Sequence, residues 1–157
     1  MKLALLMLFG LMLIIGCSSN KGLSTEEKNQ AFQRYITLNN IESVNKVTTF
    51  KFRGWSSLTN KYLILSSSHK RQYLIELAGF CSEIFWTHAL LINRTTSSSL
   101  NAGFDSISTL DEPRLKCIIK TIYPLTKQQK DEIIKITESE DKILPSTNEP
   151  EKSQHNL

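Results

Sequence analysis

The chain has 157 residues, 40% of them hydrophobic and 8% aromatic, with 19 Lys and Arg against 15 Asp and Glu. This length limits it to one domain and excludes an enzyme with a separate cofactor domain, although one modest core can form. The net charge of +4 is too weak to indicate nucleic-acid binding, which needs a dense basic stripe.

The first residues have the pattern of an export signal. An apolar run from Leu3 to Gly16 ends at Cys17 and is shorter than the about 20 residues of a membrane-spanning helix. The end of this run resembles a bacterial lipobox, in which a small residue precedes the cleaved bond and the cysteine carries lipid. We therefore expect residues 1–16 to be a lipoprotein signal peptide and Cys17 to be lipidated. The alternatives are an uncleaved membrane anchor and an ordinary secretory peptide.

A lipidated Cys17 would anchor the protein in the bacterial cell envelope, because two or three acyl chains hold firmly where one does not. Ser18 stands where an Asp commonly retains such lipoproteins at the inner membrane. The sorting rule therefore favours the outer membrane, with the protein facing the periplasm. Residues 17–23 are expected to form a polar tether between the lipid and the domain.

Two cysteines remain once Cys17 is assigned to lipid. In a compartment that oxidises thiols, Cys81 and Cys117 are expected to form a disulfide. Closing this loop contributes about 4 kcal/mol in the chain-entropy model. A metal pair or a nucleophile is the alternative, but the chain has neither a Cys-x-x-Cys spacing nor a nearby His to favour it.

Residues 24–138 are expected to form a single globular α+β domain. A Ser-x-x-Glu capping box starts at Ser24, and apolar residues at helical spacing predict a helix from Thr25 to Leu38. Alternating residues from Val47 to Arg53 then predict a strand, which Gly54-Trp55 ends.

Further strands follow along the chain. The runs 61–66 and 72–77 predict an antiparallel hairpin, and residues 78–85 a turn or short helix. Other strands are expected near 88–93, 104–109 and 115–123, with a loop at 95–99 and with Pro124 ending the last strand. The result is an antiparallel sheet of five or six strands that curls toward a half-barrel.

The C-terminal part begins with a second capping box at Thr126. Isoleucines at helical spacing then predict a short helix. Residues 139–157 are polar and rich in Pro, Ser and Glu, so we expect a disordered tail.

Several short motifs occur in a characteristic order: Phe52-Arg53-Gly54-Trp55, Tyr73–Leu77, Cys81, Gly103-Phe104-Asp105 and Cys117–Leu125. From about Phe32 to Lys127 their order and spacing resemble a group of small bacterial lipoproteins known only as a domain of unknown function. The resemblance implies a periplasm-facing lipoprotein and brings no assigned activity. The chain departs from this pattern in its acidic tail and at Ile118, where a basic residue is usual.

Catalytic signals are weak. The three histidines, His69, His88 and His155, lie in a loop, at a strand start and in the tail, so neither a metal site nor a cofactor is expected. Asp105 is the best polar candidate for a binding site, with Arg53 or Arg114 as its partner, and a structural salt bridge or turn cap is the alternative. Trp55 is a second candidate, either as part of the core or as an exposed recognition residue.

Two hypotheses for function follow. The first is a non-catalytic binding or envelope-assembly module anchored in the membrane. Basic residues outnumber acidic ones between 35 and 127, so an anionic glycan or lipid, or another envelope protein, is a candidate partner. The second is a small hydrolase or transferase with a pocket near Asp105 and His88.

Overall fold

The computed structural model describes residues 22–138. Within this range the chain forms three helices and eight strands, as an α+β fold. Their bounds are α2 Thr25–Leu38, β1 Lys46–Thr48, β2 Gly54–Ser57, β3 Tyr62–Ser68, β4 Arg71–Leu77, α3 Glu83–Trp86, β5 Leu90–Asn93, β6 Ser99–Asn101, β7 Ser106–Thr109, β8 Cys117–Leu125 and α4 Lys127–Glu138. The expected signal peptide, Cys17 and the 139–157 tail lie outside the described residues.

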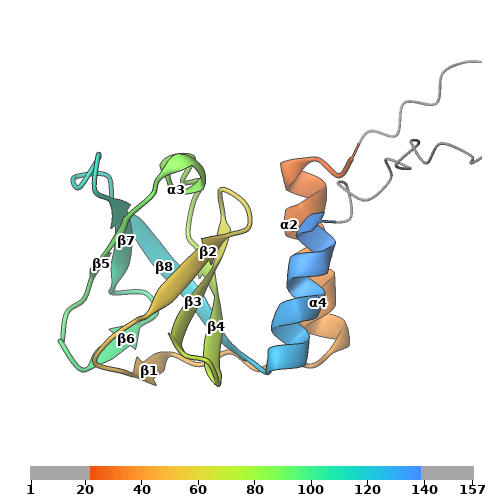
Figure 1. Ribbon diagram of the computed structural model, residues 1–157, viewed down its shortest axis with the longest axis horizontal. Coiled ribbons are helices and arrows are strands. Elements are labelled where there is room, and N and C mark those ends of the chain that lie inside the picture. Colours follow the sequence, from red (N-terminus) through yellow and green to blue (C-terminus); the bar gives the residue numbers. More distant parts are fainter. Residues whose placement is uncertain (1–21, 139–157) are drawn as a thin grey trace, which may run out of the picture.

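Six of the strands form one antiparallel sheet in the order β2-β3-β4-β8-β7-β5. The sheet curls into a half-barrel, as the sequence predicts, and the short ribbon of β1 and β6 lies at one end of it (Figure 1). Helices α2 and α4 lie side by side on the outer face of the sheet. The domain therefore has a helical layer on one side and a curled sheet on the other.

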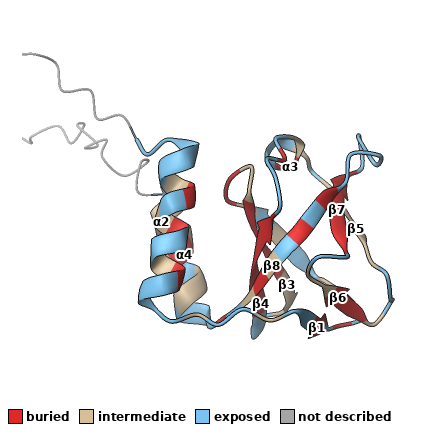
Figure 2. Ribbon diagram, turned by 180° about the vertical axis from the view of Figure 1, so that it is seen from behind, coloured by how far each residue is buried: buried red, intermediate tan, exposed pale blue. Residues whose placement is uncertain are grey.

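The apolar core has two parts, one on each face of the sheet. The part inside the half-barrel is built from Val47, Leu63, Leu65, Tyr73, Ile75, Leu77, Cys81, Ile84, Leu100, Ile107, Cys117, Ile119 and Ile122. The part beneath the helices is built from Phe32, Ile36, Leu58, Tyr62, Ile64, Leu74, Leu125 and Ile133. Strands β3 and β4 contribute to both parts because successive side chains of a strand point to opposite faces. Figure 2 shows both strands buried over most of their length.

Both helices begin at the predicted capping boxes. The Ser24 side chain accepts a hydrogen bond from the Glu27 N–H, and the Glu27 carboxylate accepts one from the Ser24 N–H. Thr126 and Gln129 make the same reciprocal pair at the start of α4. Each pair satisfies backbone donors that the first turn of a helix leaves open, which explains where α2 and α4 start.

The predicted strand from Val47 to Arg53 is wrong in its extent and in its end. The chain forms β1, leaves it, and enters β2 at Gly54, so that the Gly-Trp pair begins a strand instead of ending one. The reason is that β1 pairs with β6 while β2 pairs with β3, and the intervening residues must pass from the ribbon to the main sheet. The expected loop at 95–99 likewise gives way to β6 at Ser99.

Pro124 does not end the last strand. It lies within β8, opposite Tyr73 of β4. Strand β7 pairs with β8 only at Cys117 and Ile118, and Val44 forms an isolated bridge at Ile122, so at Pro124 itself the paired strand is β4. A residue without an N–H is tolerated there because one side of the strand has no ladder to complete.

Cys81 and Cys117 form a disulfide, as the sequence predicts. Both residues are buried, and the bond joins the segment before α3 to the start of β8. The short helix α3 is therefore fixed to the end of the main sheet by a covalent link and by the buried Ile84.

Removal of this disulfide is expected to destabilise the domain. Cys81→Ser with Cys117→Ser should lower the free energy of unfolding by about 4 kcal/mol, because the unfolded chain regains the entropy of an open loop. Denaturant unfolding of the double variant and of the oxidised parent measures the difference. Coincident curves for the two proteins would contradict a stabilising role.

Candidate functional site

Asp105 is buried in the turn that leads into β7. One carboxylate oxygen accepts hydrogen bonds from the N–H and hydroxyl of Thr95, each at 2.7 Å. The other accepts from the backbone and side-chain N–H groups of Asn101, at 2.7 and 3.2 Å. The carboxylate therefore joins the 94–98 loop to the end of β6.

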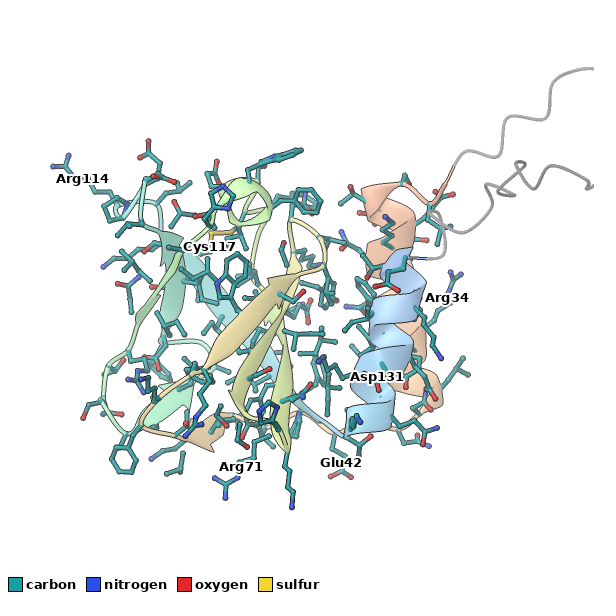
Figure 3. The ribbon with its side chains drawn as sticks, in the orientation of Figure 1. Arg34, Glu42, Arg71, Arg114, Cys117 and Asp131 are labelled. Carbon is teal, nitrogen blue, oxygen red and sulfur yellow. A yellow bond between two sulfur atoms is a disulfide. The ribbon has the colours of Figure 1, made fainter. Side chains whose placement is uncertain are left out.

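The predicted pairing of Asp105 with Arg53 or Arg114 is wrong. Arg53 and Arg114 are exposed, and Arg114 points away from the domain (Figure 3). Burial acts to raise the pKa of Asp105, but the hydrogen bonds from Thr95 and Asn101 outweigh burial and hold the pKa below its ordinary value of 3.8. Hydrogen-bond donors of Thr95 and Asn101 thus stabilise the buried negative charge of Asp105, as a salt bridge would have done.

His88 is exposed just before β5. The hollow beside Trp55, the groove between α2 and the sheet and the hollow beside α3 are lined by neither His88 nor Asp105. Among residues 22–138, no group of three or more His, Cys, Asp and Glu side chains could hold a metal ion.

Trp55 is half-buried on the edge strand β2 and packs against the core inside the half-barrel. It also lines a hollow of about 180 Å³, together with Phe52, Leu65, and Leu90 and Ile92 of the opposite edge strand β5. The hollow therefore lies where the two edges of the curled sheet approach each other. Trp55 serves packing there and leaves part of its ring at an apolar surface.

A buried carboxylate with two lysines forms a polar cluster beneath α2. Glu76 of β4 is 1% exposed, and its Oε1 atom lies 2.9 Å from Lys120 Nζ and 3.5 Å from Lys61 Nζ. Both ammonium groups thus converge on one oxygen atom. The lysines retain solvent contact, with 54% of the Lys120 side chain and 28% of the Lys61 side chain exposed.

Lys120 lies at a β-bulge of β8. Glu76 pairs with Thr121 and Leu77 pairs with Ile119, so Lys120 is the extra residue of β8. An extra residue interrupts the pairing and bends the strand locally. Before the bulge, Cys117 and Ile119 face the inside of the half-barrel. At the bulge, Lys120 reaches the helix-covered side, where Glu76 lies.

The cluster opens into a groove of about 580 Å³ between α2 and the sheet. The groove is lined by Glu26, Asn29, Gln30, Gln33, Arg34, Lys61, Tyr62 and Lys120. At its wall, Gln33 Nε2 donates a 2.7 Å hydrogen bond to the Tyr62 hydroxyl. Burial is the largest influence on the pKa of Tyr62. The hydrogen bond from Gln33 lowers this pKa, but burial together with the nearby Glu76 carboxylate raises it to about 12, so this hydroxyl stays protonated at neutral pH.

Asn29 is a buried amide in the wall of the groove. The Thr59 hydroxyl accepts from the N–H groups of Lys61 and Tyr62, so its own hydrogen goes to Asn29 Oδ1, at 2.7 Å. This pattern fixes the orientation of the amide and leaves Asn29 Nδ2 without a hydrogen-bond partner. Buried polar atoms without a hydrogen-bond partner are rare in folded proteins. Among residues 22–138, Ser57, Asn60 and Gln72 carry the others, and none of these three lines the groove.

The groove carries an excess of positive charge. Lys61 and Lys120 bring two positive charges to the single negative charge of Glu76, while Arg34 and Glu26 balance each other at the rim. The hydrogen bond and the charge of Glu76 raise the pKa of Lys120 above its ordinary 10.5, so this lysine is fully charged at neutral pH. The arrangement suits an oxyanion placed against the two ammonium groups.

The sequence did not reveal this cluster. Glu76 alternates with apolar residues and is typical of a solvent-facing strand position. Lys61 and Lys120 are ordinary surface residues in the sequence, and Lys120 lies 44 positions from Glu76. The only local signal is a carboxylate between apolar residues near the end of the hairpin.

Asp105→Asn is expected to lower the free energy of unfolding by about 2 to 3 kcal/mol, because an amide NH₂ would face N–H donors in place of one oxygen. Since the folded pKa is lowered, the contribution of Asp105 is fully present above about pH 4. It is lost as the pH falls through the folded pKa. Urea unfolding between pH 2 and 7 should show that the free energy of unfolding falls less steeply at acid pH for Asp105→Asn than for the parent.

The exposed Asp111→Asn is the matched control, because it changes the same charge near β7 outside the loop network. Equal losses in the two variants would show that the network around Asp105 contributes nothing specific.

Comparison with known proteins gives one family. Neither the curated proteins nor the solved structures contain a match to the chain. The model of a family described as "Family of unknown function (DUF6491)" matches residues 1–140, which is most of the chain. The chain therefore belongs to the DUF6491 family of unknown function.

Proposed function

We propose that this protein is a lipid-anchored lipoprotein of the bacterial cell envelope, facing the periplasm from the outer membrane, whose domain is a non-catalytic binding module for anionic groups. The observation that carries the binding proposal is the convergence of Lys61 and Lys120 on one oxygen of Glu76, at 3.5 and 2.9 Å. The anchor is supported by Gly16-Cys17 at the end of a short apolar run.

The buried carboxylate explains why two lysines can point into one groove. Two ammonium groups so close together repel each other unless an anion lies between them. Glu76 supplies that anion from inside the protein and leaves one positive charge in excess. A ligand oxyanion on the solvent side would contact both ammonium groups without displacing Glu76. Charge-assisted hydrogen bonds of this kind are about twice as strong as neutral ones.

The size of the groove limits the ligand. A volume of about 580 Å³ falls within the usual range for small-molecule sites, and its lining of amides, a phenol and charged groups is polar. A sugar that carries a carboxylate or a phosphate matches this lining, because its hydroxyls can pair with Gln30 and Gln33. The disulfide agrees with the periplasm, where thiols are oxidised.

Binding can be tested with an oligomer of glucuronic acid as the probe and a neutral glucose oligomer of equal length as the reference. Lys120→Gln should weaken binding of the acidic oligomer about tenfold, which corresponds to about 1.4 kcal/mol. In this variant Lys61 still pairs with Glu76, so no buried charge is left alone. Titration calorimetry, or amide shifts of Gln33 and Tyr62 in NMR spectra, provides the measurement.

Lys116→Gln is the matched control, because it removes the same charge from an exposed position outside the groove. The proposal fails if both variants bind like the parent, or if the neutral oligomer binds as tightly as the acidic one. Added salt should weaken binding of the acidic oligomer, because the interaction is between charges that remain partly in water.

The anchor is tested separately. Metabolic labelling with a fatty acid should label the parent and should leave Cys17→Ser unlabelled. The variant should also move from the membrane fraction to the soluble fraction. A Cys17→Ser protein that stays labelled and membrane-bound would refute the lipid anchor and would leave the groove proposal standing.

A further inference from the structure

Three exposed aromatic side chains lie within the seven residues from Phe80 to Trp86, in α3 and just before it. Phe80, Phe85 and Trp86 are 70%, 50% and 78% exposed. The rings of Phe85 and Trp86 contact each other edge to face, with their centroids 5.0 Å apart. We call these three residues the aromatic patch. Neighbouring exposed aromatic residues on a monomer mark a surface that contacts something else.

The patch is held rigidly. Ile84 of α3 is buried in the core, and the Cys81–Cys117 disulfide fixes the segment before α3 to β8. The aromatic rings themselves contribute little to the core, because they point outward from this support. A rigid display of exposed rings costs little conformational entropy when the rings are buried by a partner.

The patch lies beside the start of α2. A hollow of about 250 Å³ is lined by Thr25 and Lys28 of α2 and by Ser82, Phe85 and Trp86. Figure 1 shows α3 and the first turn of α2 at the same end of the domain, together with the β7–β8 connection. That connection carries two further exposed apolar residues, Leu110 and Leu115.

The position of the patch relative to Cys17 identifies the partner. Cys17 precedes the cap of α2, Ser24, by seven residues, and a chain of this length spans at most about 25 Å. A lipid on Cys17 therefore keeps the α3 end of the domain close to the bilayer. Trp and Phe side chains are favoured at the interface between lipid and water.

We propose that the aromatic patch contacts the lipid bilayer beside the Cys17 anchor, so that the α3 end of the domain faces the membrane. The inference rests on the lipid anchor of the proposed function. Lipid contact at two points, the acyl chains and the patch, fixes the orientation of the domain instead of leaving it free on a tether. Acidic and basic residues balance in the β7–β8 connection, with Asp111 and Glu112 against Arg114 and Lys116. The charges of this connection therefore cancel, and the contact does not require anionic lipid.

The two tryptophans of the chain allow a direct test. The lipidated full-length protein is reconstituted in phosphatidylcholine vesicles that contain lipid brominated near the headgroup. In Trp55→Phe, Trp86 is the remaining tryptophan, and its fluorescence should fall by about half relative to vesicles without bromine. In Trp86→Phe, Trp55 reports from the opening of the half-barrel, and its fluorescence should be unchanged.

A second pair of variants tests the patch itself. Phe80→Ser with Phe85→Ser in the Trp55→Phe protein should remove most of the quenching of Trp86. Phe50→Ser with Phe104→Ser is the matched control, because these phenylalanines are 77% and 81% exposed outside the patch. Circular dichroism of each variant confirms that it is folded.

The outcomes separate the two proposals. If the parent protein is not lipidated and does not enter vesicles, the anchor fails and this inference fails with it. If the protein enters vesicles but Trp86 is not quenched, the anchor stands and the patch does not contact lipid. A shift of Trp86 fluorescence to shorter wavelength with rising protein concentration, without vesicles, would show that a second copy of the chain covers the patch and would overturn the inference.

Discussion

Burial of both faces of the β3–β4 hairpin is the constraint on which the rest of the structure depends. One face meets the inside of the half-barrel and the other meets α2 and α4, so neither strand has a solvent-facing side over most of its length. A polar side chain on this hairpin must find its partners inside the protein, since an unpaired buried charge costs several kcal/mol. Glu76 meets this requirement with two lysines from the flanking segments.

The candidate site is a consequence of that requirement. The lysines satisfy Glu76 from the side on which the sheet is incompletely covered by α2, and there they remain accessible to solvent. Stability alone would need only one lysine beside Glu76. An apolar residue in place of Glu76 would serve stability as well, because a buried ion pair often stabilises a protein no more than packed apolar groups do. The second lysine gives the groove its excess positive charge. This surplus is what the proposed binding function would use.

Sequence patterns predicted the elements whose signals are local. The two capping boxes, the 61–77 hairpin and the paired cysteines each depend on neighbouring residues or on composition, and each lies where it was expected. The pattern failed where partners are distant. Gly54-Trp55 has the features of a strand end, but its role was decided by which sheet the chain enters next. Glu76 has the features of a surface residue, but it is buried because it lies on the face of the sheet that the helices cover.

Asp105 is a second residue whose partners the sequence did not predict. A lone carboxylate within a strand pattern suggests a functional group, since its sequence neighbours offer no cation. Its actual partners are Thr95 and Asn101, small polar residues that look like ordinary loop. Hydrogen bonds from four N–H and O–H donors can hold a carboxylate charged without any positive side chain.

Helix α2 connects the two proposed surfaces. Its first turn borders the aromatic patch, whereas the groove runs along the same helix from Glu26 to Arg34. At 1.5 Å per residue, these positions extend about 12 Å along the helix axis. In the proposed orientation the groove therefore begins near the lipid surface and continues away from it. An anionic ligand could then enter from the side while the α3 end rests on the membrane. The apolar packing that fixes α2 against β3 and β4 would thus set the distance between the Cys17 lipid anchor and a ligand in the groove.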